Sequence, residues 1–329
     1  MMKQIISETT RTTKNIKVMI DIIQYHKEKK NHWDQLVNRS KNGTFLHLRD
    51  YMDYHSDRFL DHSFLIYRKS KLVAVFPGNI DNQNYFTHQG LSYGGLIYIP
   101  KLSQVDVLHI FEAINEELRI LNITNLIYKP IPYIYHIHPA QEDLYALFRN
   151  KAITIACNIS STIDLSNKIK FIESRKSGMR KAKKNNIQIE ESNDFEKFWP
   201  ILNSNLENKY QKKPVHTLDE IIYLNKKFPN NIKLYCANEN DKIIAGTILF
   251  ITKKAVHVQY ISASPEGKEK GALDLLFYNL INNIYGHFSY FDFGHSNELK
   301  GEYLNEKLIF QKEGFGARGI TNYIFKYTI

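Results

Sequence analysis

The chain has 329 residues, of which 43% are hydrophobic and 24% charged, a composition typical of globular proteins that bury substantial cores. Its formal net charge of +10 indicates an anionic partner, which is a nucleic acid, a phosphorylated small molecule or an acidic membrane surface. The two cysteines, Cys157 and Cys236, lack CxxC or Cys/His spacing, which argues against a disulfide framework and a structural zinc site. We therefore expect no metal.

The first residues and the hydropathy pattern suggest a cytoplasmic protein. No run approaches the roughly 20 apolar residues that a membrane span requires. The start, "MMKQIISETTRTTKNIK", lacks the hydrophobic region and cleavage-like site of a secretory signal. We expect residues 1–17 to be disordered.

Strand and helix patterns alternate in the first half of the chain. In chain order they are a helix at 31–41, strands at 62–68 and 72–80 that form a hairpin, a glycine-broken extended stretch at 84–99, an amphipathic helix at 102–121 and a strand at 122–132. The last strand runs into a loop with three prolines, "YKPIPYIYHIHPAQED", which proline stiffens. Such a loop after a strand often borders a ligand site.

The second half has the same order of patterns. Helical residues at 167–184 and 194–227 precede strands at 231–239, 243–253 and 254–264, a helix at 272–284, a short strand at 288–294, a helix at 296–310 and a last strand at 321–329. Strand, hairpin strand, strand, helix and strand thus occur twice, at about 62–129 and 232–294, which indicates a structural repeat. We predict a bilobal α/β (α+β) protein with mixed sheets flanked by helices and domains at 18–163 and 164–329.

Five stretches carry a resemblance to a known family. They are "NGTFLHLRDYMDYHSDRF" (42–59), "HQGLSYGGL" (88–96), "SRKSGMRKAKKNN" (174–186), "SPEGKEKGALDLL" (264–276) and "FDFGHSNELKGEYLNEKLIFQKEGFG" (291–316). With the repeated layout, they resemble the FemAB-like branch of the GNAT superfamily, which has two tandem GNAT-like domains. The set looks most like bacterial nucleotide-sugar N-acyltransferases, such as the 3-hydroxybutanoyl transferase acting on dTDP-3-amino-3,6-dideoxygalactose.

That resemblance implies an activity and its co-substrate. An acyl-CoA thioester would donate an acyl group to the amine of a dTDP- or UDP-linked amino sugar, in lipopolysaccharide or capsule synthesis. The amine would attack the thioester directly, without a covalent enzyme intermediate or a metal. The partners would be these small molecules, with no nucleic acid and no membrane span expected, and a homodimer is compatible with the sequence.

The stretch 264–276 joins a glycine-bearing loop to a helix. A helix N-terminus offers unpaired N–H groups and a partial positive charge, which suit a pyrophosphate, and glycines permit close approach. On spacing alone, a plain turn with solvated lysines is the better explanation of this stretch. The resemblance implies a CoA site whose pantetheine pairs with an open strand edge, although this loop departs from the family pattern Q/R-x-x-G-x-G/A at its first and last positions. The residues expected there are Tyr260, Ile261, Ser262, Gly267, Lys268, Lys270, Gly271 and Ala272.

Two polar stretches are candidates for the acceptor side. The basic run at 174–186 suits a diphosphate by charge and by the forked geometry of arginine, or is a solvated helix face. The stretch at 42–59 is rich in histidine and paired charges, which also fits a locally ion-paired turn. The expected acceptor-binding residues are His47, Arg49, Asp53, His55, Arg58, Tyr135, His136, Arg175, Arg180 and Lys181.

Amide formation requires a neutral amine, so a carboxylate or histidine must accept a proton. Asp292, Glu298 and His216 are the predicted catalytic candidates, with Glu298 and Glu306 expected on one face of a helix. Two other functions remain open. One is a Fem-type transferase that uses aminoacyl-tRNA to build peptidoglycan cross-bridges, and the other is a GNAT-like RNA-binding module without catalysis.

Overall fold

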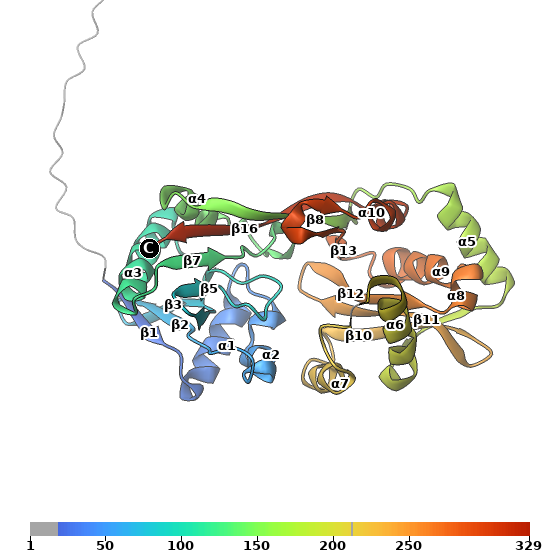
Figure 1. Ribbon diagram of the computed structural model, residues 1–329, viewed down its shortest axis with the longest axis horizontal. Helices are drawn as coiled ribbons and strands as arrows, with labels where there is room; N and C mark the ends of the chain where they lie inside the picture. The colour runs from blue at the N-terminus through green and yellow to red at the C-terminus, as the bar shows by residue number, and fades with distance from the viewer. Residues whose placement is uncertain (1–18, 212) are drawn as a thin grey trace, which may run out of the picture.

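The computed structural model describes residues 19–211 and 213–329, so the predicted disordered segment 1–17 lies outside the described residues. The chain forms two lobes, and two long strands, β8 and β16, run across the top of both in Figure 1. The N-terminal lobe holds β1 to β7 with α1 to α4, and the C-terminal lobe holds β9 to β13 with α5 to α9. The predicted bilobal architecture of mixed sheets and flanking helices is confirmed.

One ten-stranded sheet connects the lobes, in the order β4-β5-β7-β16-β8-β13-β12-β11-β10-β9. Its strands are β4 (Asn79–Asp81), β5 (Asn84–Phe86), β7 (Asn125–Tyr128), β8 (Ile153–Asp164), β9 (Gln188–Ser192), β10 (Ile232–Glu239), β11 (Lys242–Ile251), β12 (Ala255–Ala263), β13 (Tyr290–His295) and β16 (Arg318–Thr328). The last strand of the chain pairs with β7 of the first lobe and with β8. The C-terminal strand therefore completes the sheet between the two lobes.

A second sheet belongs to the N-terminal lobe alone, in the order β1-β2-β3-β6. Its strands are β1 (Ile20–Gln24), β2 (Phe64–Arg68), β3 (Lys71–Phe76) and β6 (Ile97–Tyr98). The predicted hairpin at 62–80 appears as the antiparallel pair β2 and β3. The predicted stretch 84–99 is not one strand, because its residues divide between β5 in the large sheet and β6 in the small one.

Ten α-helices lie among the described residues. They are α1 (Lys30–Arg39), α2 (Arg49–Met52), α3 (Gln104–Ile120), α4 (Glu142–Arg149), α5 (Glu173–Lys184), α6 (Phe195–Tyr210), α7 (Leu218–Lys227), α8 (Pro265–Glu269), α9 (Ala272–Asn279) and α10 (Glu306–Glu313). Caps begin several of them: Ser103 and Asp106 form a capping box on α3, as Thr217 and Glu220 do on α7.

The predicted helix at 296–310 is wrong in its first half. Residues Asn297–Glu298 (β14) and Tyr303–Leu304 (β15) form a small antiparallel hairpin instead, and the helix begins only at Glu306. The backbone causes the break, since Leu299 and Lys300 both have positive φ, which a helix does not allow. Glu298 and Glu306 therefore do not share a helical face.

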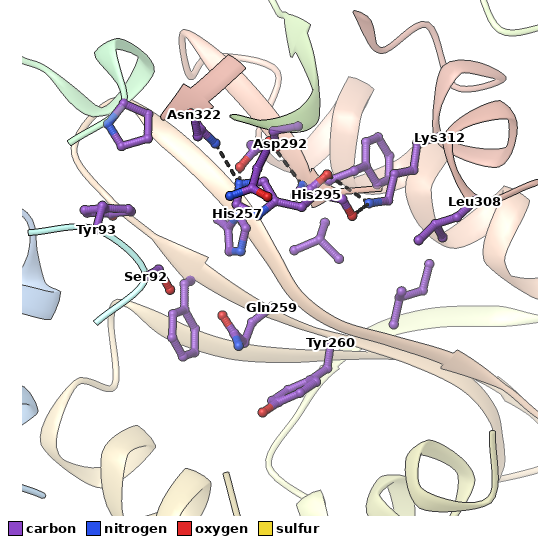
Figure 2. A pocket seen from close by; sticks show the side chains of 18 of the residues that line it. Ser92, Tyr93, His257, Gln259, Tyr260, Asp292, His295, Leu308, Lys312 and Asn322 are labelled. Atoms are coloured by element: carbon purple, nitrogen blue, oxygen red, sulfur yellow. Dashed lines mark hydrogen bonds and ion pairs between the residues drawn. The ribbon is translucent and has the colours of Figure 1, made fainter. Parts of the chain in front are cut away.

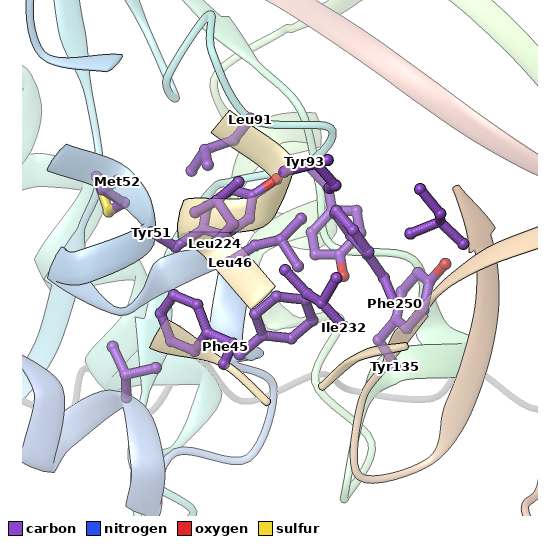
Figure 3. Close-up of a cluster of buried hydrophobic side chains, with 14 of the residues drawn as sticks. Phe45, Leu46, Tyr51, Met52, Leu91, Tyr93, Tyr135, Leu224, Ile232 and Phe250 are labelled. Carbon is purple, nitrogen blue, oxygen red and sulfur yellow. The ribbon is translucent and has the colours of Figure 1, made fainter. Parts of the chain in front are cut away.

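The largest core cluster contains residues from both lobes (Figure 3). Phe45 of the N-terminal lobe packs against Phe228 and Phe250 of the C-terminal lobe, with ring centroids 5.4 and 5.5 Å apart. Aromatic pairs at such distances add to the burial of apolar area. The lobes therefore share a core as well as a sheet, which fixes the position of the cavity between them.

Candidate active site

A cavity of about 460 Å³ lies between the two lobes. The N-terminal lobe contributes Leu46, the loop at Ser92 and Tyr93, and the proline-rich stretch from Lys129 to Tyr135. The C-terminal lobe contributes β12, the end of β13 and one side each of α6 and α10. Figure 2 shows His257, Asp292, Gln259 and Tyr260 around this space. A cavity of this size, with a few converging polar groups, has the properties of a small-molecule site.

Two strands separate inside this cavity. β12 and β13 are parallel, and their pairing ends at His257 opposite Asp292. Gly294, two residues further along β13, has a φ of +72°, a conformation that glycine adopts without strain. The register of β13 against β8 shifts at the same place. Beyond His257, no strand among the described residues pairs with this edge of β12.

A bulge in β12 shapes the open edge. Leu249 and Ile248 of β11 pair with Val258 and Tyr260, so that Gln259 is an extra residue without a partner. The bulge turns Tyr260 to the same face of the sheet as His257. The hydroxyl of Tyr260 is fixed by His216, whose Nδ1 lies 2.7 Å away.

Asp292 is almost fully buried, with 2% of its surface exposed. Its carboxylate accepts hydrogen bonds from the hydroxyls of Ser160 (2.6 Å), Thr162 (2.9 Å) and Tyr135 (2.9 Å), from Nδ1 of His257 (2.7 Å) and from the N–H of Gly294 (3.1 Å). Burial acts to raise the pKa of Asp292, but the hydrogen bonds and the charge of His257 outweigh it and hold the pKa below its usual range. Asp292 is therefore an ionised carboxylate that orients its neighbours.

His257 stands between Asp292 and the cavity. Its Nδ1 is bound to Asp292, its side chain is 24% exposed, and it lines the cavity. An ionised Asp292 accepts a hydrogen bond from Nδ1–H of His257, which leaves Nε2 unprotonated in the neutral ring. No hydrogen bond to Nε2 occurs among the described residues. The pair thus has the geometry of a histidine base oriented by a carboxylate.

Lys312 of α10 stabilises the turn at the end of β13. Its Nζ donates to the carbonyl oxygens of Gly294 (2.8 Å) and His295 (2.5 Å). Burial lowers its pKa to about 8 despite the opposing charge of Asp292. Lys129 lines the opposite wall, where its Nζ donates to the carbonyl oxygen of Leu91 and burial lowers its pKa to about 8.

The predicted CoA-binding residues separate into two groups. Tyr260, Ile261, Ser262 and Lys268 line the cavity, next to Leu273 at the start of α9. The other four, Gly267, Lys270, Gly271 and Ala272, do not line it.

The glycines of this loop serve packing instead. A Cβ on Gly271, which has a φ of +72°, would lie 2.3 Å from the carbonyl oxygen of Gly178 in α5, and a Cβ on Gly267 would lie 2.2 Å from that of Ile244 in β11. Ala272 has no exposed surface. Lys270 forms ion pairs with Glu239 and Glu266. Helix α5 therefore covers the N-terminus of α9, where the sequence predicted a pyrophosphate.

The predicted acceptor residues of the stretch 42–59 do not line the cavity, although Leu46 of that stretch does. Arg49 is 2% exposed, and its guanidinium is paired with Asp53 and Asp61. His47 accepts from the N–H of Thr44, and burial lowers its pKa to about 4. His55 and Arg58 also lie away from the cavity. His55 is buried near Gly90, and Arg58 is paired with Glu220 of α7.

Of the remaining predicted residues, some line the cavity and others lie away from it. Tyr135 lines the cavity and donates to Asp292. His136, Glu298 and His216 do not line it, and burial lowers the pKa of His216 to about 4. The basic residues Arg175, Arg180 and Lys181 belong to α5, at the outer end of the C-terminal lobe (Figure 1). The structure thus brings Asp292, Tyr135, Tyr260, Ile261, Ser262 and Lys268 together around one space.

His257, Lys312 and Lys129 were not predicted, although they lie in the cavity. Both His257 and Asp292 occupy polar positions between apolar neighbours in predicted strands, which was the available signal. Their meeting depends on the parallel register of β12 and β13, which a single sequence does not specify.

The described residues include no group of three or more His, Cys, Asp or Glu side chains arranged to hold a metal ion. Within the same part of the chain, every helix is too short or too polar to span a membrane.

Comparison with known proteins identifies the fold. Residues 215–303, which include His257 and Asp292, match the family model described as an acetyltransferase (GNAT) domain. No curated protein sequence matches the chain. Among solved structures, FemX is similar with a TM-score of 0.70 and 10% identity over 94% of this chain and 97% of FemX.

Two further structures have the same fold. L-PGS from Bacillus licheniformis has a TM-score of 0.60 and 10% identity over 92% of each chain. A tandem GNAT protein from the clavulanic acid biosynthesis pathway has a TM-score of 0.50 and 10% identity, over 94% of this chain and 98% of that one. The predicted fold class is confirmed: the chain has the two-lobed fold of these structures, and residues 215–303 in its second half match a GNAT domain model.

Proposed function

We propose that the chain is an N-acyltransferase that moves an acyl group from an acyl-CoA thioester to the amine of a nucleotide-linked amino sugar. The observation that carries the proposal is the pair of Asp292 and His257, which lies in the cavity at the point where β12 and β13 separate. A GNAT domain match over the same residues supports acyl transfer as the class of reaction.

The donor would lie along the open edge of β12. On this side, backbone groups from Val258 to Ser262 pair with no strand of the described chain, and they suit the amides of a pantetheine chain. Lys268 lies at the end of this edge and supplies positive charge for a phosphate. The edge stops at Ala263, whose carbonyl oxygen accepts from Asn205.

The acceptor amine would enter from the wall formed by the N-terminal lobe. His257 Nε2 takes a proton from the amine, while Asp292 stabilises the imidazolium that forms. The C–N bond forms, the C–S bond breaks, and the leaving thiolate takes up the proton. The backbone N–H at the Gln259 bulge is the donor proposed to stabilise the carbonyl oxygen in the transition state.

Direct attack fits the positions of the cysteines. Neither Cys157 nor Cys236 lines the cavity, and burial raises the pKa of Cys236 to about 12. A thiol with so high a pKa is a poor nucleophile near neutral pH. The proposal therefore has no acyl-cysteine intermediate.

One observation favours a second candidate, an aminoacyl-tRNA-dependent transferase of the Fem type. Helix α5 covers the N-terminus of α9 through the contact of Gly178 with Gly271, which removes the expected cradle for the CoA pyrophosphate. An aminoacyl-tRNA donor lacks the CoA pyrophosphate and does not require a binding site for it.

A thermal-shift screen distinguishes the two candidates. CoA thioesters are tested alone and with dTDP- and UDP-linked amino sugars, since a ligand that binds only the folded protein raises its melting temperature. Stabilisation by a CoA thioester, with release of free CoA thiol when the sugar is added, is the expected result. No shift with any CoA species, together with a transfer activity that ribonuclease abolishes, would establish the second candidate.

A further inference from the structure

The segment from Lys168 to Lys184 is strongly basic. Eight of its 17 residues are Lys or Arg, and Glu173 is its one acid. It comprises a loop and α5, which forms the outer end of the C-terminal lobe in Figure 1. No residue of this segment lines the cavity between the lobes. Binding of a substrate in that cavity therefore does not explain the positive charge of this segment.

Few of these cations are neutralised within the protein. Arg175 is paired with Asp274, Arg180 with Glu173 and Lys181 with Glu269. Across residues 19–211 and 213–329, no carboxylate forms an ion pair with the other five: Lys168, Lys170, Lys176, Lys183 and Lys184. Most of this positive charge thus faces the solvent.

Apolar groups lie among the lysines. Ile169 is 46% exposed and Ile172 is 37% exposed. Between this loop, α5 and α9 lies a second cavity of about 320 Å³. Its apolar lining is Ile163, Ile169, Phe171, Met179, Tyr278, Ile281 and Phe315, and its basic lining is Lys168, Lys170 and Lys176. An apolar hollow bordered by cations suits a ligand that is both anionic and hydrocarbon-rich.

This cavity is separate from the candidate active site. Phe315 lines the second cavity and stacks on Phe293, which lines the first, with ring centroids 5.5 Å apart. The aromatic pair closes the space between them. A ligand on the outer surface would therefore leave the active site free.

We propose that residues 168–184 are a docking surface for a bilayer that contains anionic phospholipids. The lysines contact the lipid phosphates, Ile169 and Ile172 enter the boundary between headgroups and acyl chains, and the second cavity receives the end of one lipid chain. Each lysine near an anionic surface adds to binding, as do the buried isoleucines.

An RNA partner would satisfy the lysines but not the apolar groups. Proteins that bind single strands present exposed aromatic rings on which bases stack. Here the exposed apolar residues are aliphatic, and Phe171 packs edge-on against Tyr278 and Phe315. The combination favours a lipid surface.

Co-sedimentation of the full chain with vesicles tests this. The vesicles are phosphatidylcholine and phosphatidylglycerol in equal parts, with pure phosphatidylcholine as reference. We expect binding to the anionic vesicles only, weakened by added salt. The variant Lys168→Gln/Lys170→Gln/Lys176→Gln should partition on the order of a hundredfold less, and Ile169→Ser/Ile172→Ser about tenfold less.

A matched variant removes three charges elsewhere. Lys27, Lys226 and Lys227 are exposed and lie outside α5 and its loop, so Lys27→Gln/Lys226→Gln/Lys227→Gln should bind like the wild type. Unfolding curves show that each variant is folded. Equal binding to pure phosphatidylcholine, or an equal loss in the matched variant, would overturn the proposal. Absence of vesicle binding would also overturn the proposal. If a short RNA binds instead, and the Lys168→Gln/Lys170→Gln/Lys176→Gln variant no longer binds that RNA, the surface is a nucleic-acid site.

Discussion

Asp292 and His257 make different contributions to the proposed proton transfer. Both oxygens of Asp292 are occupied by donors inside the protein, whereas no donor in the described chain forms a hydrogen bond to Nε2 of His257. Asp292 is therefore a positioning residue, and His257 is the group that meets the amine. The catalytic role predicted for Asp292 becomes an indirect one in this account.

Replacing Asp292 by asparagine tests that division. The amide of Asp292→Asn can donate to Nδ1 of His257, which favours the tautomer with the proton on Nε2 and removes the base. We expect kcat to fall by about 10²–10⁴-fold with little change in donor affinity. Steady-state kinetics and calorimetric titration of the donor measure the two effects. A folded variant with wild-type kcat would contradict the positioning role.

Lys312 links the site to the stability of the protein. Burial lowers its folded-state pKa to about 8, whereas the unfolded chain has the ordinary value of about 10.4. Between these values the unfolded state binds more protons, so stability should rise with pH from about 8 to about 10.4. Denaturant unfolding should show that the free energy of unfolding of the wild type rises by about 3 kcal/mol more over this window than that of Lys312→Met. Equal slopes would show that folding does not lower the pKa of Lys312.

At the scale of elements, two irregular places shape the cavity. The bulge at Gln259 and the turn at Gly294 interrupt two neighbouring strands at nearly the same level, and this opens the edge of β12. The contact of α5 with α9 supports the same region from outside through Gly178 and Gly271. We therefore expect a substitution at Gly271 to reduce the stability of the fold more than the affinity for the donor.

Alanine at Gly271 should destabilise the protein by about 2–4 kcal/mol, since the site requires positive φ and the added Cβ collides with backbone. Gly286→Ala is the milder comparison, because its φ is not in the positive region and its Cβ would lie 3.0 Å from the carbonyl oxygen of Asn282, a tight contact but a longer one than at Gly271. Urea unfolding measures both. If Gly271→Ala keeps wild-type stability but loses donor affinity, the glycine faces the ligand after all.

At the scale of the whole molecule, the lobes are joined by the ten-stranded sheet and by a common core. We therefore expect one cooperative unfolding transition in calorimetry. Phe45→Ala removes contacts with Phe228 and Phe250. It should lower the free energy of unfolding by about 3–5 kcal/mol while the protein still unfolds in a single transition. Two separate transitions, of which Phe45→Ala moves only one, would show that the lobes fold independently.

Local patterns predicted the two hairpins, several helices and the two-lobed fold, but they missed β1, β8, β9 and α4. Alternating polarity in β12 and β13 is readable without a structure, and so is the helical stripe of α3. The site required more, because it depends on the register that sets His257 opposite Asp292 and on the fold that brings Tyr135 to them. Charge-rich stretches were less informative, since Arg49 and Asp53 pair with each other in the N-terminal lobe and do not reach the cavity.

The most direct test of the central claim is kcat for His257→Gln with an acyl-CoA donor and the amino-sugar acceptor that the thermal-shift screen identifies. His138→Gln is the matched control, since His138 is exposed and outside the cavity. The account predicts that His257→Gln loses about 10²–10⁴-fold in kcat while it still binds the donor, and that His138→Gln behaves as wild type. Wild-type kcat in a folded His257→Gln variant would contradict it.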